Sequence, residues 1–412
     1  MKLYKIALRN ISRNKRRSGL SAAAIAIAAA AIVFLFAFFA GMLNDMRTNM
    51  WTYLTGAVRV RHSDFDKYER LNPVHLAIPG YDALLKDIMA DPAVRAVSPR
   101  INFPGRVPVG EGTEKINVMG VGVDFALEAK YQDYEATLTE GSLPRMGTRE
   151  ALIGRALAAK LDAGIGGKFT VLSQSGSRGS NAYTFTVVGI LDLPIAGLET
   201  LMVQVPLDTA QRFLWLPGQV GEILLKVDPQ VDSPEDAALR LGKGLKSEVP
   251  LNVWDYKQVN GMAAMMDLAA SIYDITAIIF FLLASTVIIN TTIMVIFERM
   301  NEIGTLAAMG MKGSQLVRLF FLEALFIGII GSLTGIAIGM AVAGYFGGAG
   351  LNLFSDAMEG MDTMGMGSVI YPVLNFKSTV MVFVYSVLVT GLATWWPARR
   401  AAKVTPVEAL RY

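Results

Sequence analysis

The strongest limit on the fold of this chain comes from four long stretches without a charged residue. They are residues 18–44, 275–297, 324–355 and 378–398. A helix needs about 20 apolar residues to cross the hydrocarbon core of a membrane, and all four stretches reach that length. The third stretch is long enough to include a loop as well. We therefore predict four transmembrane helices.

The composition supports a membrane protein. Hydrophobic residues make up 53% of the 412 residues, and the mean hydropathy of +0.41 is high for a soluble globular protein. The net charge of +3 includes no basic stripe of the kind that binds nucleic acid. The chain lacks cysteine, which excludes disulfides and cysteine-bound metals, and His62 and His75 are too few for a histidine metal site. We expect no metal and no cofactor in this chain.

The distribution of basic residues predicts the orientation in the membrane, because cytoplasmic loops are enriched in Lys and Arg. Arg299, Lys312 and Arg318 lie between the second and third stretches, and more basic residues follow the fourth. Both termini of this multi-pass membrane protein are therefore expected in the cytoplasm. The basic residues before the first stretch are Lys2, Lys5, Arg9, Arg13, Lys15, Arg16 and Arg17, whereas Arg47 stands almost alone on its other side.

A cleaved signal peptide is the alternative for the first stretch. Its apolar run is longer than the about 7–15 residues of a signal core, so we expect it to remain as an anchor. Residues 1–17 are expected to form an amphipathic elbow helix that lies on lipid headgroups. Simple positive flanking charge explains the same basic residues, and both interpretations stay open. The apolar face of this helix would consist of Leu3, Ile6, Ala7 and Ile11.

Residues 45–271 are expected to form a large mixed α/β domain outside the cytoplasm. The longest uncharged run in this region, residues 179–191, is too short to cross a membrane. Short runs rich in β-branched residues alternate there with helical patterns. The predicted strands are residues 57–60, 115–123, 168–172, 184–191, 201–205 and 222–227, and the predicted helices are residues 81–89, 150–161 and 234–245, the last with Ser233 as its N-cap.

No catalytic motif emerges from this domain. A phosphate-binding loop is missing, so nucleotide would have to bind to another chain. Acidic clusters, such as Asp64, Asp66 and Glu69 or Asp133 and Glu135, do not have the spacing of a calcium loop. They are interpreted as solvated surface rather than as a cation site. Residues 173–181 are rich in Gly and Ser and predict a flexible hairpin tip, either a plain loop or a partner contact.

The short segment 298–318 between the second and third stretches predicts an amphipathic helix. Ile303, Leu306, Ala307 and Gly310 share one face, which is expected to press into a groove on a cytoplasmic partner. An inert loop is the alternative, and it would typically be polar throughout. Glu298, Arg299, Glu302 and Lys312 are expected to form a charged border of the helix.

The third stretch also contains a glycine repeat and a neighbouring acid. Gly331, Gly335 and Gly339 recur every fourth residue and predict a flat face for close helix packing, with or without a signalling role. Glu323 lies at the entrance of this stretch, and Asn290, Thr291 and Thr292 lie inside the second. Polar groups at membrane depth are often functional or bond to neighbouring helices, and we expect bonding here.

Several segments together resemble one family of transport proteins. The run ERMNEIGTLAAMGMKGSQLVRLFFLEALFIGIIGSLTGIAIG and the C-terminal WWPARRAAKVTPVEALRY resemble the membrane domain of FtsX/MacB/LolC-type ABC transporter permeases. The start ALRNISRNKRRS resembles the N-terminal elbow of the same family. EALIGRALAAKLDAGIGGKFTVLS, FTVVGIL and QVPLDTAQRFL are similar to pieces of its periplasmic domain. The resemblance covers essentially the whole chain and is strongest over residues 271–412.

The resemblance implies a non-catalytic membrane subunit that binds a separate ABC ATPase, which would hold the ATP and Mg. It also implies a second permease, either another copy or a paralogue, and motion relayed from the ATPases to the periplasmic domains. The coupling residues it implies are Glu302, Ile303, Gly304, Leu306, Ala307, Met309 and Gly310.

The resemblance leaves three functions open. The first is lipoprotein release from the inner membrane to a periplasmic carrier. The second is MacB-like efflux of peptides or drugs, and the third is FtsX-like control of cell-wall hydrolases. The expected organisation is an elbow (1–17), a first helix (18–44), the outer domain (45–271), a second helix (272–297), a coupling segment (298–318), a third helix (319–345), an outer loop (346–376), a fourth helix (377–397) and a tail (398–412).

Overall fold

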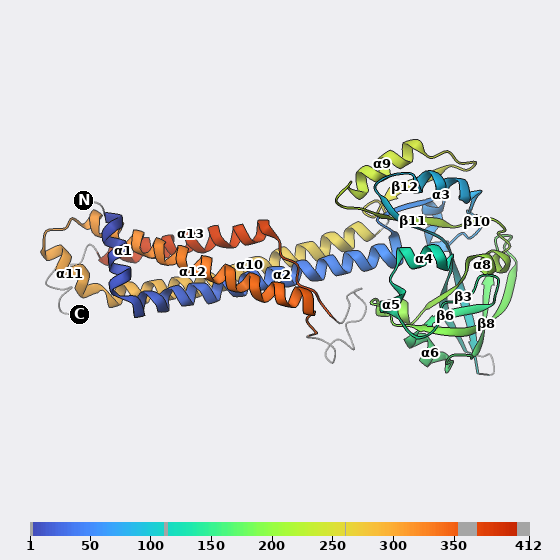
Figure 1. Ribbon diagram of the computed structural model, residues 1–412, viewed down its shortest axis with the longest axis horizontal. Helices are drawn as coiled ribbons and strands as arrows, with labels where there is room; N and C mark the ends of the chain where they lie inside the picture. The colour runs from blue at the N-terminus through green and yellow to red at the C-terminus, as the bar shows by residue number, and fades with distance from the viewer. Residues whose placement is uncertain (1–2, 111–113, 260, 353–368, 402–412) are drawn as a thin grey trace. The chain divides into compact units, whose positions relative to one another are not determined.

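The computed structural model describes residues 3–110, 114–259, 261–352 and 369–401 (Figure 1). These residues fall into two units, and each has its own internal contacts. Among the described residues, the first unit combines those up to Asn44 with residues 268–352 and 369–401, and the second consists of residues 45–267. An α/β domain inserted between the first and second long helices is therefore confirmed.

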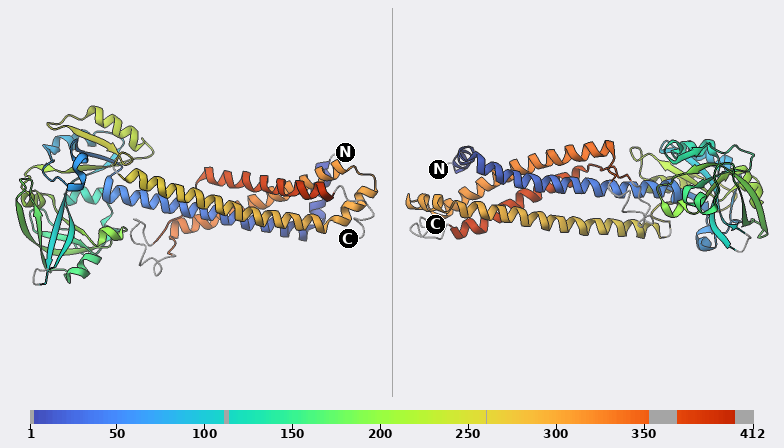
Figure 2. Two further views of the ribbon diagram at one scale, coloured as in Figure 1. Left: turned by 180° about the vertical axis from the view of Figure 1, so that it is seen from behind. Right: turned by 90° about the horizontal axis from the view of Figure 1, so that it is seen from below.

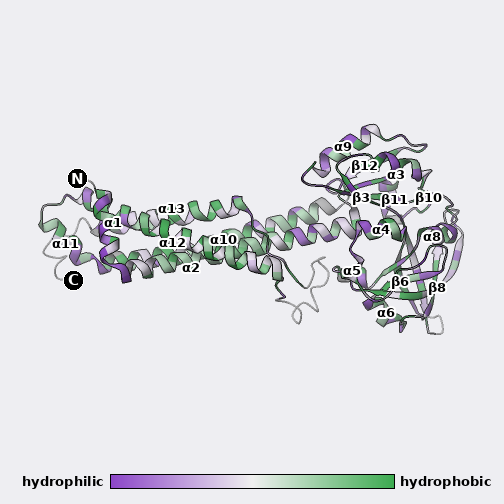
Figure 3. Cartoon of the chain, viewed as in Figure 1, coloured by the Kyte–Doolittle hydropathy of each residue, from purple (hydrophilic) through white to green (hydrophobic). Residues whose placement is uncertain are grey.

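All the long elements of the first unit are helices. The described residues contain four helices that are long and apolar enough to cross a membrane, as predicted. Figure 2 shows these helices from two further sides, and Figure 3 shows hydrophobic residues along their length. The helices that contribute to this unit are α1 (Leu3–Arg13), α2 (Lys15–Met50), α10 (Met262–Glu298), α11 (Met300–Ala308), α12 (Gly313–Ala349) and α13 (Phe376–Ala401).

Three of the long helices extend well beyond the predicted spans. Helix α2 has 36 residues, and α10 and α12 have 37 each. At 1.5 Å per residue, each is about 54 Å long, which is longer than the roughly 30 Å of a hydrocarbon core. Helix α2 continues directly into a π-helical turn, η1 (Trp51–Thr55), and the helical path ends at Gly56, whose φ is +70°.

Aromatic side chains hold α2 against α10 within the first unit. The ring of Phe36 lies 5.2 Å from the ring of Phe281 and 6.0 Å from that of Tyr273, measured between centroids. Such tilted and edge-on pairs add to the dispersion contacts that hold helices together where lipid supplies no hydrophobic driving force. Ile336 of α12 and Val382 of α13 belong to the same apolar cluster.

The second unit is built on a ten-stranded mixed sheet. Its strand order is β12-β1-β11-β3-β4-β9-β6-β8-β5, and β7 pairs with both β3 and β8. Strands β2 and β10 form a separate two-stranded sheet. The strands are β1 (Val58–His62), β2 (Ile78–Pro79), β3 (Val94–Val109), β4 (Glu114–Val123), β5 (Leu138–Gly141), β6 (Glu150–Gly154), β7 (Lys168–Gln174), β8 (Ser180–Leu191), β9 (Met202–Pro206), β10 (Gln219–Val220), β11 (Glu222–Val227) and β12 (Leu251–Asp255).

Short helices complete this domain, and its core contains a cluster of phenylalanines. Phe103 of β3 and Phe185 of β8 both lie edge-on to Phe213, at centroid distances of 5.5 and 6.1 Å. Ser233 accepts a hydrogen bond from Asp236 N and caps its helix, as predicted. The helices are η2 (Phe65–Leu71), α3 (Tyr81–Met89), α4 (Phe125–Tyr131), α5 (Tyr134–Thr137), α6 (Arg155–Leu161), α7 (Ala196–Glu199), α8 (Leu207–Leu214) and α9 (Pro234–Gly244).

The predicted helix at residues 150–161 is wrong over its first half. Residues Glu150–Gly154 form β6, and only Arg155–Leu161 form a helix. Strand β6 lies between β8 and β9 in the sheet. The consecutive residues Ala151, Leu152 and Ile153 are fully buried, which shows that both faces of the strand are covered. A short apolar run covered on both faces lacks the alternation that distinguishes a strand from a helix.

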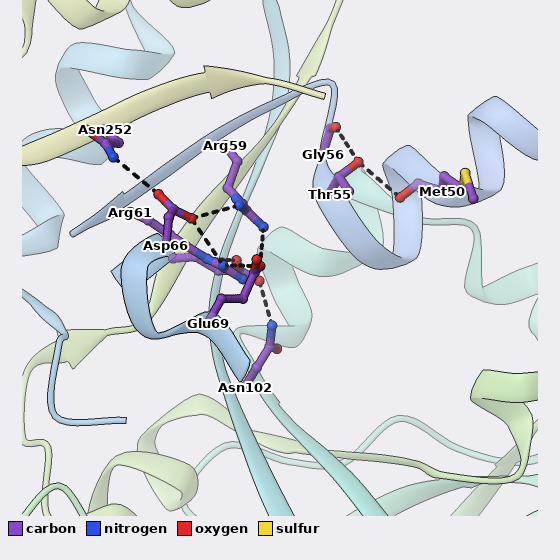
Figure 4. A network of polar contacts seen from close by, with 10 residues as sticks. Met50, Thr55, Gly56, Arg59, Arg61, Asp66, Glu69, Asn102 and Asn252 are labelled. Carbon is purple, nitrogen blue, oxygen red and sulfur yellow. Dashed lines mark hydrogen bonds and ion pairs between the residues drawn. The ribbon is translucent and has the colours of Figure 1, made fainter. Parts of the chain in front are cut away.

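Interpreting residues 64–69 as solvated surface is wrong for Asp66. Its carboxylate is buried and pairs with Arg59 at 3.1 Å (Figure 4). Arg61 pairs with Glu69 at 3.0 Å and with Glu222 at 2.7 Å. Burial alone would raise the pKa of Glu222, but Arg61 and Arg59 hold that pKa below its usual value. These ion pairs join the 3-10 helix η2 to the sheet strands β1 and β11.

The predicted hairpin tip at residues 173–181 forms between β7 and β8. It does not stand free of the domain. Gly176 N donates to Leu214 O at 2.7 Å, and Asn181 Nδ2 donates to Phe213 O at 2.8 Å. The tip is therefore tied to the C-terminal end of α8.

Candidate functional site

The predicted amphipathic helix between the second and third long helices is present as α11. Helix α10 ends at Glu298, and Arg299 takes a non-helical conformation and becomes the N-cap of α11. Ile303 N donates to Arg299 O at 3.0 Å, which starts the new helix in a changed direction. At the other end, Gly310 has a φ of +89°, a left-handed conformation that favours glycine, and α12 begins at Gly313.

The apolar face of α11 packs against its own chain. The side chain of Ile303 is only 2% exposed and belongs to a cluster with Leu316 and Phe320 of α12 and Ala398 of α13. Gly304 is buried as well. The expectation that this face would be free for a partner is therefore wrong at Ile303. The physical reason is that the helix is too short to stand away from the bundle, so Ile303 is covered by the adjoining helices.

A different face of α11 is open to solvent. Met309 is 71% exposed, and Asn301, Thr305 and Ala308 are also exposed. A groove with a volume of about 360 Å³ runs beside this face, between α11 and the N-terminal helix α1. It is lined by Ile6, Asn10 and Arg13 from α1 and by Glu302, Thr305, Leu306, Met309, Met311 and Leu319 from α11, the turn after it and α12.

The prediction that Arg299 forms part of a charged border of α11 is wrong. Its side chain is 1% exposed and forms an ion pair with Glu323 of α12, which is 3% exposed. An unpaired charge at this depth would cost several kcal/mol, so each of the two groups requires the other. The pair connects the start of α11 to α12 from inside the bundle.

A small cavity borders this ion pair. It has a volume of about 40 Å³ and is lined by residues of all four long helices. Arg299 Nε lacks a hydrogen-bond partner among the described residues. Polar atoms in a cavity of this size are suited to binding ordered water. The hydroxyl groups that line it come from Ser21, Thr291, Thr292, Thr390 and Thr394.

Sequence reasoning identified Glu323 but missed its partner. The available signal was the position of Arg299, which follows an uncharged run of 23 residues with only Glu298 between them. An acid inside a membrane helix needs a cation nearby, and Arg299 lies only a short helix and turn away in sequence.

The glycine repeat of α12 lies against α2. A Cβ atom added to Gly335 would come within 2.3 Å of Ala26 O, and one added to Gly331 or Gly339 would come within 2.7 or 2.8 Å of a backbone oxygen. Those oxygens belong to Ala22 and Ala30. The two backbones can therefore approach closely only because both helices carry small residues at this interface.

The expectation that the polar residues at positions 290–292 bond to neighbouring helices is wrong for Thr291 and Thr292. The hydroxyls of Thr291 and Thr292 donate to the carbonyl oxygens of Val287 and Ile288, four residues earlier in α10. This local bond satisfies a hydroxyl without a second helix. Asn290 is exposed on the outer side of α10.

Taken together, this end of the first unit has a short helix that is fixed on one face and exposed on the other. The fixed face includes a buried ion pair and an apolar contact, and the exposed face borders a groove. Within the described parts of the chain, no group of three or more acidic or histidine side chains is placed to hold a metal ion. The arrangement is suited to transmitting force from a bound partner to the long helices.

Two protein families match most of the chain. The family described as MacB-like periplasmic core domain matches residues 18–239. The family described as FtsX-like permease C-terminal matches residues 275–406. The first covers more than half of the chain, and the second includes α11, α12 and α13.

Named relatives come from two groups of proteins. The lipoprotein-releasing system transmembrane protein LolC of Neisseria meningitidis is 23% identical over 69% of this chain and 71% of its own length. The macrolide export ATP-binding/permease protein MacB of Bdellovibrio bacteriovorus is 24% identical over 98% of this chain, which spans only 60% of that protein. Among solved structures, the periplasmic region of MacB from Actinobacillus actinomycetemcomitans aligns with a TM-score of 0.36 at 17% identity, covering 50% of this chain and 92% of that region.

Proposed function

The chain belongs to the LolC/LolE/MacB family of ABC transporter permeases, and from this premise we propose that it couples ATP hydrolysis in a separate chain to motion of its periplasmic domain. The ATPase would bind at α11 and the groove beside it. The long helices would then carry the movement to the domain between α2 and α10. The permease itself performs no chemical step in this scheme.

The observation that carries this proposal is that α11 is fixed on one face and exposed on the other. Ile303 and Arg299 fix it to α12 on the inner face, while Thr305 and Met309 are exposed on the outer face. A flexible loop would change its conformation when a bound partner moved. A helix packed against the bundle would instead transmit that movement to the other helices. Methionine at an exposed position is also an adaptable anchor for a hydrophobic pocket on a partner.

Release of lipoproteins is the cargo function that we favour. The chain matches 71% of the LolC relative, whereas it spans 60% of the MacB relative, whose name includes ATP binding. The chain thus corresponds to a larger share of the lipoprotein-releasing relative than of the macrolide-export relative. MacB-like efflux is the second candidate, because the family match over the periplasmic domain is to MacB-like proteins. FtsX-like signalling is the third.

A second permease, either another copy or a paralogue, is part of the proposed complex. Helix α10 is the least covered of the four long helices, with 17% of its most apolar segment buried against 44% for α2. Its exposed side carries Asn290, and a polar amide that faces lipid is costly. Packing of α10 against a helix from the second permease would cover both features. Lipid would contact the remaining exposed surface of the four long helices.

The proposed location is the inner membrane, with both termini and α11 in the cytoplasm. The cluster of basic residues before the first apolar stretch supports this orientation, as do Arg299, Lys312 and Arg318 around α11. The domain of residues 45–267 would then lie in the periplasm, where a lipoprotein cargo and a periplasmic carrier could reach it.

Substitution of the exposed anchor tests the proposed ATPase site. We expect Met309→Asp to remain inserted in the membrane but to lose its ATPase on co-purification, because a charge would enter an apolar contact. The matched control is Met146→Asp, which changes an exposed methionine in the other unit. Equal retention of the ATPase by Met309→Asp and the control would remove α11 as the coupling site.

Cargo is tested separately with the purified complex. Lipoprotein added to the complex should stimulate ATP hydrolysis if the cargo is lipid-anchored. Stimulation by peptides or macrolides alone would favour the efflux function instead. A rate that none of these compounds changes would count against both transport functions and favour signalling.

A further inference from the structure

Helix α2 and the turn η1 form one helical path, and side chains of the second unit bind to the end of this path. The last carbonyl groups of a helix have no partner within the helix, so other groups must satisfy them. In the turn η1, the carbonyls of Trp51, Thr52 and Tyr53 all accept hydrogen bonds from side chains of the α/β domain. All of these residues belong to the second unit.

Arg100 of β3 makes the central contact. Its Nη2 donates to Thr52 O at 2.9 Å and its Nη1 donates to Tyr53 O at 3.2 Å. The side chain is only 4% exposed. A guanidinium group at the C-terminal end of a helix also interacts favourably with the negative end of the helix dipole. The contact therefore combines two directed hydrogen bonds with a charge interaction.

Glu128 of α4 fixes the position of Arg100. It accepts from Arg100 Nη2 at 2.6 Å and from Gln132 Nε2 at 3.0 Å. Ser98 accepts from Arg100 Nε at 2.8 Å and donates to Glu128. Burial alone would lower the pKa of Arg100, but the Glu128 carboxylate outweighs this effect and leaves that pKa raised. The guanidinium is thus held charged and in one orientation.

Tyr131 makes a further hydrogen bond to the same turn. Its hydroxyl donates to Trp51 O at 2.9 Å, and its ring lies 5.3 Å from the Arg100 guanidinium carbon. Trp51 O already accepts from Gly56 N at 2.9 Å, so the tyrosine is not needed to close the π-helical turn. Its bond joins the turn to α4 instead.

The contact between Arg100 and η1 connects the end of the helical path directly to the sheet of the domain. Arg100 lies on β3, which pairs with β11, β4 and β7. Arg100 itself pairs in register with Glu222 on one side and Val123 on the other. A displacement of the helix end would therefore act on a strand that is bonded to three others, rather than on a loop.

We propose that Arg100 and Tyr131 form a clamp that transmits movement of the α2–η1 helical path to the sheet of the periplasmic domain. Both are positioning residues, and Glu128 holds the clamp in place. This inference rests on the proposed function, because it needs a nucleotide-driven movement to transmit. It adds the site at which that movement would enter the domain.

Two tyrosine variants separate transmission from stability. Tyr131→Phe removes the hydroxyl that binds the helix end. Tyr134→Phe removes an equally well-bonded hydroxyl, which donates to Gln204 Oε1 at 2.8 Å within the domain rather than to a carbonyl of η1. Each variant loses one buried hydrogen bond, so we expect similar decreases in melting temperature. Arg100→Lys keeps the charge but loses the forked pair of bonds to the two carbonyls.

The readout is a distance measured in the assembled complex. Because the chain has no cysteine, Ile27→Cys on α2 and Ser180→Cys on β8 provide unique sites for two spin labels. The doubly labelled chain is diluted in unlabelled chain, combined with its ATPase and measured by pulsed electron spin resonance. Samples without nucleotide are compared with samples trapped by ATP and vanadate.

We expect the wild type and Tyr134→Phe to show the same nucleotide-dependent shift in distance. Tyr131→Phe and Arg100→Lys should still bind the ATPase and hydrolyse ATP, but their shift should be lost or strongly reduced. A full shift in both of these variants would overturn the clamp and leave the proposed function intact. The absence of any shift in the wild type would overturn the proposed function, and the clamp with it.

Discussion

At the scale of single residues, the ion pair between Arg299 and Glu323 explains how a short helix can be held firmly at a membrane boundary. Both side chains are almost fully buried. Because both charges are removed from bulk water, neither can be left alone without a large desolvation cost. The pair is worth more as a connection between α11 and α12 than as a source of net stability.

A double-mutant cycle tests this account of the pair. We expect Arg299→Met or Glu323→Met alone to lower the free energy of unfolding by about 3–5 kcal/mol, because each leaves an uncompensated buried charge. The double variant should be markedly more stable than either single variant. Thermal unfolding in detergent measures all three. A double variant whose loss equals the sum of the single losses would show that the two residues do not act together.

What sequence predicts at this scale is the presence of a charge, not its partner. Glu323 was identifiable because it interrupts an apolar segment. Arg299 was assigned to the border of α11, because counting positions on an ideal helix does not reveal that the residue is an N-cap with a non-helical backbone. Its side chain therefore points into the bundle instead of along the helix surface.

At the scale of elements, small residues determine how α2 and α12 fit together. Gly331, Gly335 and Gly339 face the backbone of α2 at intervals of one turn. Their spacing was visible in the sequence, but the identity of the facing helix was not. Only the structure shows that Ala22, Ala26 and Ala30 of α2 supply the other side.

Two glycines of the same helix provide a matched comparison. Gly335→Ala would place a Cβ atom 2.3 Å from Ala26 O, so the helices must separate, and we expect a loss of about 1–3 kcal/mol in unfolding free energy. Gly344→Ala meets no atom within 4 Å and should stabilise the helix by up to about 1 kcal/mol. Melting temperatures in detergent measure both effects. Equal effects of the two substitutions would contradict close packing at Gly335.

Elements of the α/β domain were predictable to different degrees. Helix α3 and strand β11 lie where the hydrophobic pattern placed them. Strand β3 was missed although it has 16 residues and lies inside the sheet. It contains Pro99, Pro104 and Pro108, and proline normally argues against an interior strand because it cannot donate a ladder hydrogen bond. Pairing with β4 and β11 over most of its length compensates for the missing donors.

At the scale of the whole molecule, the membrane determines what can be predicted. Four spans and a water-soluble domain between the first two follow from the rule that a lipid-exposed segment must satisfy its own backbone and avoid charge. Partners do not follow from this rule. The open face of α11, the exposed Asn290 on α10 and the gripped end of η1 became visible only once the chain was folded.

Site-specific crosslinking at Met309 tests most directly whether the exposed face of α11 binds an ATPase. A photoreactive phenylalanine analogue at position 309 should yield, in native membranes, a covalent adduct between the permease and its nucleotide-binding subunit. The same analogue at Tyr345, which is 70% exposed near the other end of α12, should yield no such adduct. An adduct from position 345 but not from position 309 would contradict the account.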